Sequence, residues 1–371
     1  MDLSHQRRAW LALASVLGVG PRTSGALVRA LNGIEGVMRA SRAQLAAVAG
    51  VGRVRVEALV RGLASADPAA IERDAEAVGC RVVTPVDPGY PPAVLAAADP
   101  PPALWVRGTL PGVERPAVAV VGTRGASVYG ARVAHRMGEG LARAGVVVVS
   151  GLARGIDAAA HAGSLAGGGP TVAVLGSGVD VVYPPEHTGL VAEIAREGAV
   201  VSEHPPGTSP LPGHFPRRNR IVATLTRATV VVEAGITSGA LNTARSALQE
   251  GRDVLAVPGP VDRESHAGCH LLLREGATLC EGVDDVLRVL GGGGSRAGPR
   301  GRGAGARSRP PPEAGPDLVV WNALDGDEVL DPDALVRLTG LSPDEVAAAI
   351  TSLELSARAT WVPGVGVRRV D

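Results

Sequence analysis

Short apolar runs rich in valine recur along the middle of the chain, and each is followed by a glycine or small polar residue and then by a helix-like pattern. They start at Ala117 and end at Gly259, and read AVAVVG, GVVVVS, TVAVLG, AVVSE, ATVVVEA and RDVLAVPG. Runs that are apolar throughout are typical of strands buried on both faces, and strands that alternate with helices indicate a parallel sheet. The pattern predicts an α/β fold with a Rossmann-like, doubly wound core over residues 117–290.

The region before this core follows a different pattern. Residues 1–64 read as short helices, and a glycine-rich turn before a helix occurs twice, in GVGPRTSGALVRAL and AGVGRVRVEALV. This repeat is typical of helix-hairpin-helix units, in which glycine lets a phosphate approach the amides of the next helix. A helical bundle with glycine turns and no ligand is the alternative. Residues 65–116, rich in proline, are predicted to be a connector that leads into the core.

Two further segments follow the core. Residues 291–316 consist largely of glycine, proline and arginine, so we expect a disordered basic linker that has no apolar surface to bury. Residues 317–371 predict three short helices, at DLVVWNAL, DPDALVRLTG and SPDEVAAAITSLEL, and then a hairpin at ARATWVPGVGVRRV. Three helices followed by a hairpin suggest a C-terminal winged-helix domain.

Charge is sorted along the chain although its sum is zero. Residues 1–64 hold nine arginines and three acids, whereas residues 317–371 hold four arginines and ten acids. Positive charge near the N-terminus favours DNA binding there. Residues 317–345 contain eight acids and one arginine, Arg337, so the helices of the winged-helix domain should repel phosphate. We therefore expect these helices to bind a protein partner. Only its wing, with Arg358, Arg368 and Arg369, carries charge that suits DNA.

The absence of lysine excludes several enzyme classes. All 37 lysine and arginine residues are arginines, so the chain has no Walker A lysine and no Schiff-base lysine. Its three cysteines, Cys80, Cys269 and Cys280, are not spaced as metal ligands and fit a reduced cytoplasmic protein without disulfides. No apolar run reaches membrane-spanning length. We therefore expect a soluble, cytoplasmic protein with no metal and no cofactor.

The chemistry of the core is expected in the loops that follow its strands. Ligands of open parallel sheets bind outside the carboxyl ends of the strands, and glycine-rich turns there bind phosphate through backbone amides. The loop GTRGAS lacks the spacing of a dinucleotide-binding motif. Asp157, His161 and Glu233 are the candidate acid–base groups, but an acid or histidine beside a glycine turn more often caps a helix.

The segment HFPRRNR, residues 214–220, adds side chains that suit a nucleic acid. A guanidinium binds a phosphodiester, and an exposed phenyl ring stacks on any base, worth about 1–3 kcal/mol per base. Phe215, the one phenylalanine in the chain, stands beside Arg217, Arg218 and Arg220. The alternative places Phe215 in the core and pairs Arg218 and Arg220 with neighbouring acids, with Asn219 as a helix cap.

Six blocks between residues 117 and 277 together resemble one bacterial family. They are VAVVGTRGASVYG, VVSGLARGIDAAAH, VAVLGSGVDVVYPPEH, VVSEHPPGTSPLPGHFPRRNRIVATL, VVVEAGITSGALNTARSALQEGRDVLAVPG and GCHLLLREGA, in the family's order. The sequence is therefore similar to the DNA-processing protein A (DprA, also called Smf) family, whose flanking domains also match those expected here.

The resemblance implies a non-enzymatic, homodimeric protein that binds and protects single-stranded DNA and loads RecA onto it during natural transformation. Carried over by motif, the DNA-binding residues are Gly122, Thr123, Arg124, Phe215, Arg217, Arg218, Asn219 and Arg220. Two positions depart from the family pattern: His270 replaces the usual asparagine, and Ile236 stands where a polar residue is common.

Two other functions remain open from the residues alone. The glycine-rich loops also suit a Rossmann-like nucleotide-processing enzyme of the nucleoside monophosphate hydrolase type, which would use Glu233 or Asp157. A structural adaptor that docks a partner through its acidic C-terminal domain would bind no DNA.

Overall fold

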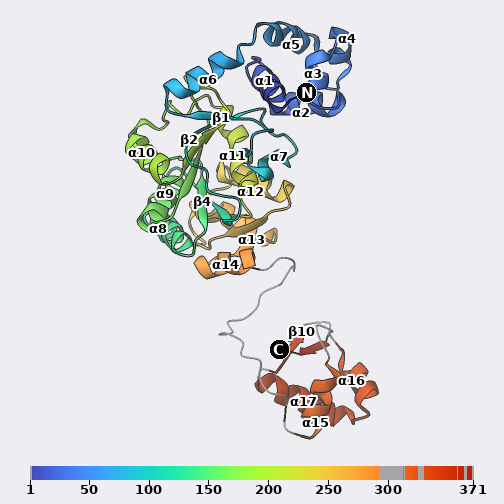
Figure 1. Cartoon of the computed structure of the whole chain (residues 1–371). Helices are drawn as coiled ribbons and strands as arrows, with labels where there is room; N and C mark the ends of the chain where they lie inside the picture. The colour runs from blue at the N-terminus through green and yellow to red at the C-terminus, as the bar shows by residue number, and fades with distance from the viewer. Residues whose placement is uncertain are drawn as a thin grey trace. The chain divides into compact units, whose positions relative to one another are not determined.

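The structure is a computed structural model that describes residues 2–291, 312, 314–324, 330–356, 358–362 and 366–369. The chain forms two compact units, Met1–Gly293 and Gly294–Asp371 (Figure 1). The predicted linker, residues 291–316, lies almost entirely outside the described residues.

Among the described residues, nine strands form one sheet at the centre of the first unit. Their order is β1-β2-β6-β5-β4-β3-β7-β8-β9, and all neighbours from β6 to β9 are parallel, which confirms the predicted doubly wound core. The strands are β1 (Arg81–Val83), β2 (Leu104–Gly108), β3 (Ala117–Val121), β4 (Val147–Ser150), β5 (Thr171–Leu175), β6 (Ala199–Ser202), β7 (Ala228–Val231), β8 (Asp253–Ala256) and β9 (Thr278–Leu279).

Alternate residues of each central strand pack against opposite layers of helices, as expected where both faces of a sheet are buried. In β3, Val118 and Val120 join the core made with α8 (Val128–Arg143), α9 (Ile156–Ala166) and α14 (Val283–Gly291). Ala119 and Val121 join the core on the other face, made with α11 (His214–Thr224), α12 (Ala240–Gln249) and α13 (Ala267–Arg274). Helix α10 (Thr188–Glu197) packs on β5 and β6 through Val191 and Ile194.

The segment predicted as a connector, residues 65–116, is part of the sheet. It contains α6 (Pro68–Ala77), β1, α7 (Pro92–Leu95) and β2. Strand β2 pairs antiparallel with both β1 and β6, so this segment extends the sheet by two strands. Its prolines lie outside the strands, and the Tyr90 hydroxyl donates a hydrogen bond to Pro101 O at 2.6 Å across the loop. Strand β1 has only three residues, and β2 (LWVRG) lacks the valine-rich run of the central strands, which is why the sequence suggested a connector.

The N-terminal region is helical, as predicted, with its own hydrophobic core. Its helices are α1 (Leu3–Ala14), α2 (Pro21–Ala30), α3 (Ile34–Arg39), α4 (Arg42–Ala47) and α5 (Arg53–Ser65). The repeated glycine turns share one conformation, because Gly18 and Gly50 both have φ of +80°, a region that favours glycine. Arg7 bridges this region to the sheet domain through ion pairs with Glu72 and Asp87.

The second unit has the predicted winged-helix elements. Its described parts are α15 (Pro316–Ala323), α16 (Pro332–Thr339), α17 (Pro343–Leu355), β10 (Ala359–Val362) and β11 (Gly366–Arg369). The two strands pair antiparallel. Ser342 and Glu345 form a capping box at the start of α17, and the Arg369 guanidinium lies 3.4 Å from the centre of the Trp321 ring. The wing therefore holds one of its arginines against the unit's own helix.

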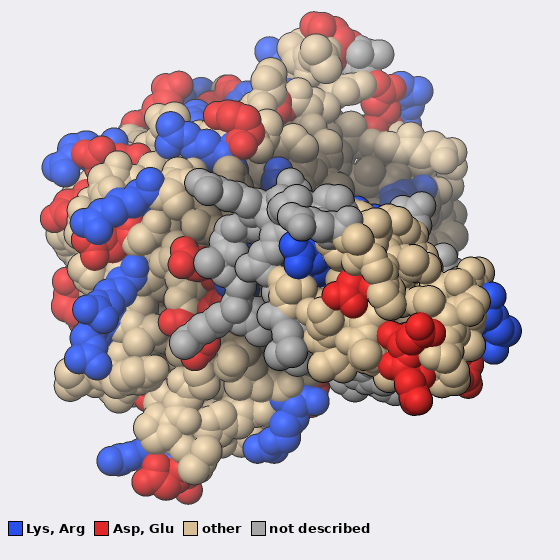
Figure 2. Space-filling view, turned by 90° about the horizontal axis from the view of Figure 1, so that it is seen from below, with Lys and Arg blue, Asp and Glu red and all other residues tan. Residues whose placement is uncertain are grey.

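Surface charge over α8 and α14 is mixed. Figure 2, which shows the face on the side of these helices, has arginine and acidic side chains interspersed over the first unit. Two ion pairs form within these helices, Arg143 with Glu139 in α8 and Arg288 with Asp285 in α14. Within the described ranges, the helices fall short of the length and hydropathy that a membrane crossing requires.

Candidate functional site

A pocket of about 1120 Å³ lies at the carboxyl edge of the sheet, where the chain order of the strands reverses between β3 and β7. Such reversal points are the common ligand sites of doubly wound folds. Six of the eight DNA-binding residues predicted from the sequence line it: Gly122, Thr123, Arg124, Phe215, Arg218 and Asn219. Arg217 and Arg220 do not.

The turn after β3 forms one wall of the pocket and is held by the end of β7. Thr123 N donates to Glu233 O at 2.7 Å, and a Cβ on Gly122 would lie 2.5 Å from Ile156 Cγ1, so only glycine fits there. The Glu233 carboxylate is buried and accepts hydrogen bonds from Ser127 N at 3.0 Å and Ser127 Oγ at 2.8 Å. Glu233 therefore fixes the turn instead of facing the pocket.

Arg124 and two aromatic rings meet at the mouth of the pocket. Arg124 Cζ lies 5.3 Å from the centroid of the Phe215 ring, a cation–π distance. The Tyr183 ring lies 5.7 Å from the Phe215 ring and is tilted by 50° to it. Arg124 is exposed, and it has no carboxylate partner among the described residues. An exposed guanidinium beside the half-buried Phe215 ring and the exposed Tyr183 ring suits a phosphate followed by a base.

Arg218 has a different environment, because its side chain is buried. Its guanidinium Nη1 donates to Gly151 O and Val174 O, and only 4% of the residue is exposed. Burial lowers its pKa to about 10, and the nearby Asp157 opposes that shift. Asp157 accepts from Gly151 N at 3.1 Å and from Ala153 N at 3.3 Å. Arg218 and Asp157 thus shape the turn after β4 that forms the pocket floor.

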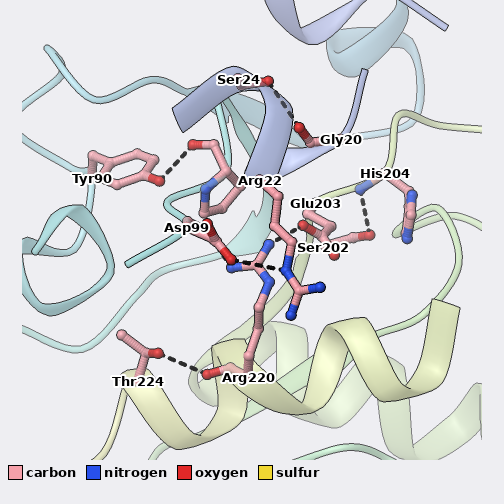
Figure 3. A network of polar contacts seen from close by, with 11 residues as sticks. Gly20, Arg22, Ser24, Tyr90, Asp99, Ser202, Glu203, His204, Arg220 and Thr224 are labelled. Atoms are coloured by element: carbon pink, nitrogen blue, oxygen red, sulfur yellow. Dashed lines mark hydrogen bonds and ion pairs between the residues drawn. The ribbon is translucent and has the colours of Figure 1, made fainter. Parts of the chain in front are cut away.

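Arg217, Asn219 and Arg220 are spread around α11. Asn219 Nδ2 donates to Gly239 O at 3.3 Å, which ties α11 to the start of α12. Arg220 pairs with the buried carboxylate of Glu203 and donates to Asp99 O at 2.8 Å (Figure 3). Arg217 is exposed on the same side of α11 as Arg220. The ion pairing with a neighbouring acid, which the sequence analysis left open as an alternative to DNA binding, therefore applies to Arg220.

The candidate acid–base groups are all buried. His161 Nδ1 lies 2.7 Å from Thr171 Oγ1, and burial lowers its pKa to about 3. Burial raises the pKa of Asp157. Neither His161 nor Glu233 lines the pocket, and in the described parts of the chain no group of three or more metal-ligating side chains is found. All three residues are held by hydrogen bonds within the fold.

Several pocket residues were not singled out from the sequence. Thr237 and Ser238 of the turn after β7 and Asn242 of α12 line the pocket, and so do Tyr183 and Ser265. The signal available was the Ser/Thr/Asn content of GITSGALNT directly after a buried strand. Ile236, which departs from the family pattern, is 55% exposed in the same wall. His270 Nε2 lies 3.1 Å from Gly259 O, outside the pocket.

Comparison with known proteins matches all three parts of the chain to family models. Residues 81–291 match DNA recombination-mediator protein A, residues 304–365 match the DprA winged helix domain, and residues 11–65 match a SAM-like helix-hairpin-helix tandem. Protein Smf of Synechocystis is 33% identical over 99% of both chains.

Two solved structures are similar to the chain. DNA processing protein A of Streptococcus pneumoniae is 35% identical, with a TM-score of 0.66 over 75% of this chain and 95% of that one. DNA processing protein A of Helicobacter pylori, described for its single-stranded DNA binding mode, is 26% identical, with a TM-score of 0.51 over 57% of this chain and 97% of that one. The chain therefore belongs to the DprA/Smf family of DNA recombination mediators.

Proposed function

We propose that this protein binds single-stranded DNA in the pocket between β3 and β7. The observation that carries the proposal is the unpaired Arg124 guanidinium 5.3 Å from the Phe215 ring at the pocket mouth. Arg124 contacts a phosphate, and Phe215 stacks on the adjacent base. The solved structure of the Helicobacter pylori relative, which is described for its single-stranded DNA binding mode, supports the same class of ligand.

The other predicted residues take graded roles in this proposal. Gly122 and Thr123 keep the turn after β3 close to the strand, and Asn219 holds α11 against α12. Arg218 supports the pocket floor from below. Arg217 and Arg220 lie on the neighbouring face of α11, where a strand that leaves the pocket over the first turn of the helix passes them.

We further propose that the protein acts as a homodimer in the cytoplasm, protects incoming DNA and loads RecA onto it in natural transformation. Membership of the recombination-mediator family supports this role. The acidic residues at the starts of the helices in the second unit, Asp317, Asp333, Asp344 and Glu345, suit a protein partner better than DNA. RecA assembly on labelled single strands, with and without this protein, tests the loading step.

Fluorescence anisotropy with labelled single- and double-stranded oligonucleotides tests the DNA site. Replacing Arg124 by alanine should weaken single-strand binding and lower the slope of log K against log salt by about 0.7, the value for one phosphate. Phe215→Ala should cost about 1–3 kcal/mol of binding free energy and leave the slope unchanged. Arg143→Ala, on α8 at the opposite edge of the sheet, is the control. Unchanged binding in both pocket variants would refute the site.

A nucleotide-processing enzyme is the competing function. It requires an acid–base pair that reaches a substrate in the pocket, whereas His161 and Glu233 are buried outside it and Asp157 already accepts two backbone hydrogen bonds. Hydrolysis of a nucleoside monophosphate by purified protein, lost in Glu233→Gln, would favour the enzyme.

A further inference from the structure

Helix α11 separates the pocket from the N-terminal helices. Phe215, Arg218 and Asn219 line the pocket, whereas Arg217 and Arg220 point to the other side. Residues of a helix are rotated by about 100° from one to the next, so neighbours in the HFPRRNR segment must divide between two faces. The first turn of α11 is therefore shared by the pocket and by the seam between α11 and the N-terminal helices.

Asp99 joins three segments at this seam. Its carboxylate accepts from Arg22 Nε of α2 at 3.2 Å, and its backbone carbonyl accepts from Arg220 Nη1 of α11 at 2.8 Å. Figure 3 shows the guanidinium groups of Arg22 and Arg220 both beside Asp99, with Glu203 next to Arg220. The N-terminal helical domain thus contacts the helix that carries the predicted DNA-binding segment.

Positive charge exceeds negative charge at the seam. Three arginines, Arg22, Arg217 and Arg220, lie there with two carboxylates, Asp99 and Glu203. Arg217 Nη1 lies 4.0 Å from where a Cβ on Gly20 would be, next to the start of α2. Within the described chain, Arg217 has no hydrogen-bond or ion-pair partner. An excess cation therefore faces solvent between the two domains.

The ion pair between Arg22 and Asp99 is open to competition. The Arg22 side chain is 92% exposed and that of Asp99 is 24% exposed. Exposed ion pairs contribute only about 0–1 kcal/mol, so a phosphodiester can replace the carboxylate as the partner of Arg22 at little cost. Arg220 differs, because its partner Glu203 is buried with a side chain only 4% exposed.

We propose that Arg22 of the N-terminal helical domain and Arg217 of α11 form a second phosphate-binding subsite, which takes the backbone of a single strand as it leaves the pocket over the first turn of α11. This subsite rests on the proposed function, because it receives a strand whose neighbouring nucleotides occupy the pocket. It gives the helical domain a direct part in single-strand binding.

The contact between Arg22 and Asp99 could also have a purely structural role, because it holds the N-terminal helical domain against the sheet domain. Two variants separate the two roles, because both remove the ion pair and change the charge of the seam in opposite directions. Arg22→Ala removes a cation, and Asp99→Asn removes an anion and frees the Arg22 guanidinium. If phosphate binds there, the two variants must change DNA affinity with opposite sign. If the contact only docks the domain, they must change it in the same direction.

The experiment uses the full chain and fluorescein-labelled oligothymidylates of about 6 and about 20 nucleotides, a range that spans common single-strand site sizes. Anisotropy titrations at several salt concentrations give the affinity and its salt slope. Wild type, Arg22→Ala, Arg217→Ala and Asp99→Asn are compared, with Arg143→Ala as a control at the opposite edge of the sheet and Arg124→Ala as the pocket variant. Arg217→Ala breaks no described contact and therefore tests the subsite without disturbing the fold.

For the long probe, we expect Arg22→Ala and Arg217→Ala each to lower the salt slope by about 0.7, which is a loss of about eightfold in affinity at ~0.05 M salt and about threefold at ~0.2 M. Asp99→Asn should raise the affinity by a factor of similar size. The short probe, held by the pocket, should respond to Arg124→Ala and not to the seam variants.

Two results would overturn the subsite while leaving the pocket in place. One is a loss of affinity in Arg124→Ala with no change in any seam variant. The other is a change of the same sign in Arg22→Ala and Asp99→Asn. If wild type binds neither probe, the proposed function fails, and the subsite fails with it.

Discussion

Replacing Arg218 by alanine should lower the free energy of unfolding of the core, although this residue belongs to the segment predicted to bind DNA. The substitution takes the Arg218 donor from the buried carbonyls of Gly151 and Val174 and removes the positive charge that acts on Asp157. Breaking a buried charge interaction by removing one partner costs about 3–5 kcal/mol. At about 2–4 °C per kcal/mol for a chain of this size, the melting temperature should fall by about 6–20 °C.

The pH dependence of the loss identifies its cause. Burial raises the pKa of Asp157, and the charge of Arg218 opposes that rise. A carboxyl group with a raised folded-state pKa supports stability at low pH, and that support is lost as pH rises through the folded-state pKa. Without Arg218 the pKa of Asp157 rises further, so the stability gap between variant and wild type should be larger at pH ~8 than at pH ~5. Asp157→Asn in the same chain should close part of the gap at pH ~8.

Urea unfolding followed by circular dichroism, with calorimetry, measures this effect. Arg124→Ala is the matched control, because an exposed arginine without a described partner should change stability by less than about 0.5 kcal/mol. DNA affinity is measured on the same preparations. An Arg218→Ala protein that keeps its wild-type stability and loses only DNA affinity would refute the structural role, and would return Arg218 to the set of phosphate ligands.

Two other perturbations test the packing of the core. His161 is buried, and burial lowers its pKa to about 3. As pH falls below ~6.5, this residue takes up a proton in the unfolded chain before it does so in the folded one, so the free energy of unfolding should fall by about 1.4 kcal/mol per pH unit. Urea titrations across that range should show a shallower fall in His161→Gln, and an equal slope in both proteins would contradict the assignment. Gly163→Ala on α9 would place its Cβ 2.0 Å from His135 O of α8, so we expect a loss of about 1–3 kcal/mol by thermal unfolding. Gly189→Ala on α10, where the new Cβ meets nothing within 4 Å, should instead be neutral or stabilise by up to about 1 kcal/mol, and an equal loss in both would show that close helix packing is not the cause.

Most of the core architecture could be read from local pattern. The valine-rich runs must be buried on both faces because they offer no polar alternate position, and that condition is met by a parallel sheet between two helical layers. The same reasoning placed the loops of interest at one edge, and the pocket lies there. The winged-helix unit was equally visible, because Ser342 and Glu345 mark the start of α17 by their spacing.

Pairings between distant segments could not be read in this way. Strand β2 becomes part of the sheet through β6, about ninety residues later, and its sequence, LWVRG, lacks the valine-rich run by which the central strands are recognised. The arginines of HFPRRNR look alike in sequence, because helical spacing separates their faces without saying which face meets solvent. In the fold, Arg218 is buried and donates to the carbonyls of Gly151 and Val174, Arg220 forms an ion pair with Glu203, and Arg217 is exposed. Local spacing therefore determined the elements and the edge that holds the pocket, whereas partners supplied by the folded chain decided which charges remain free to bind.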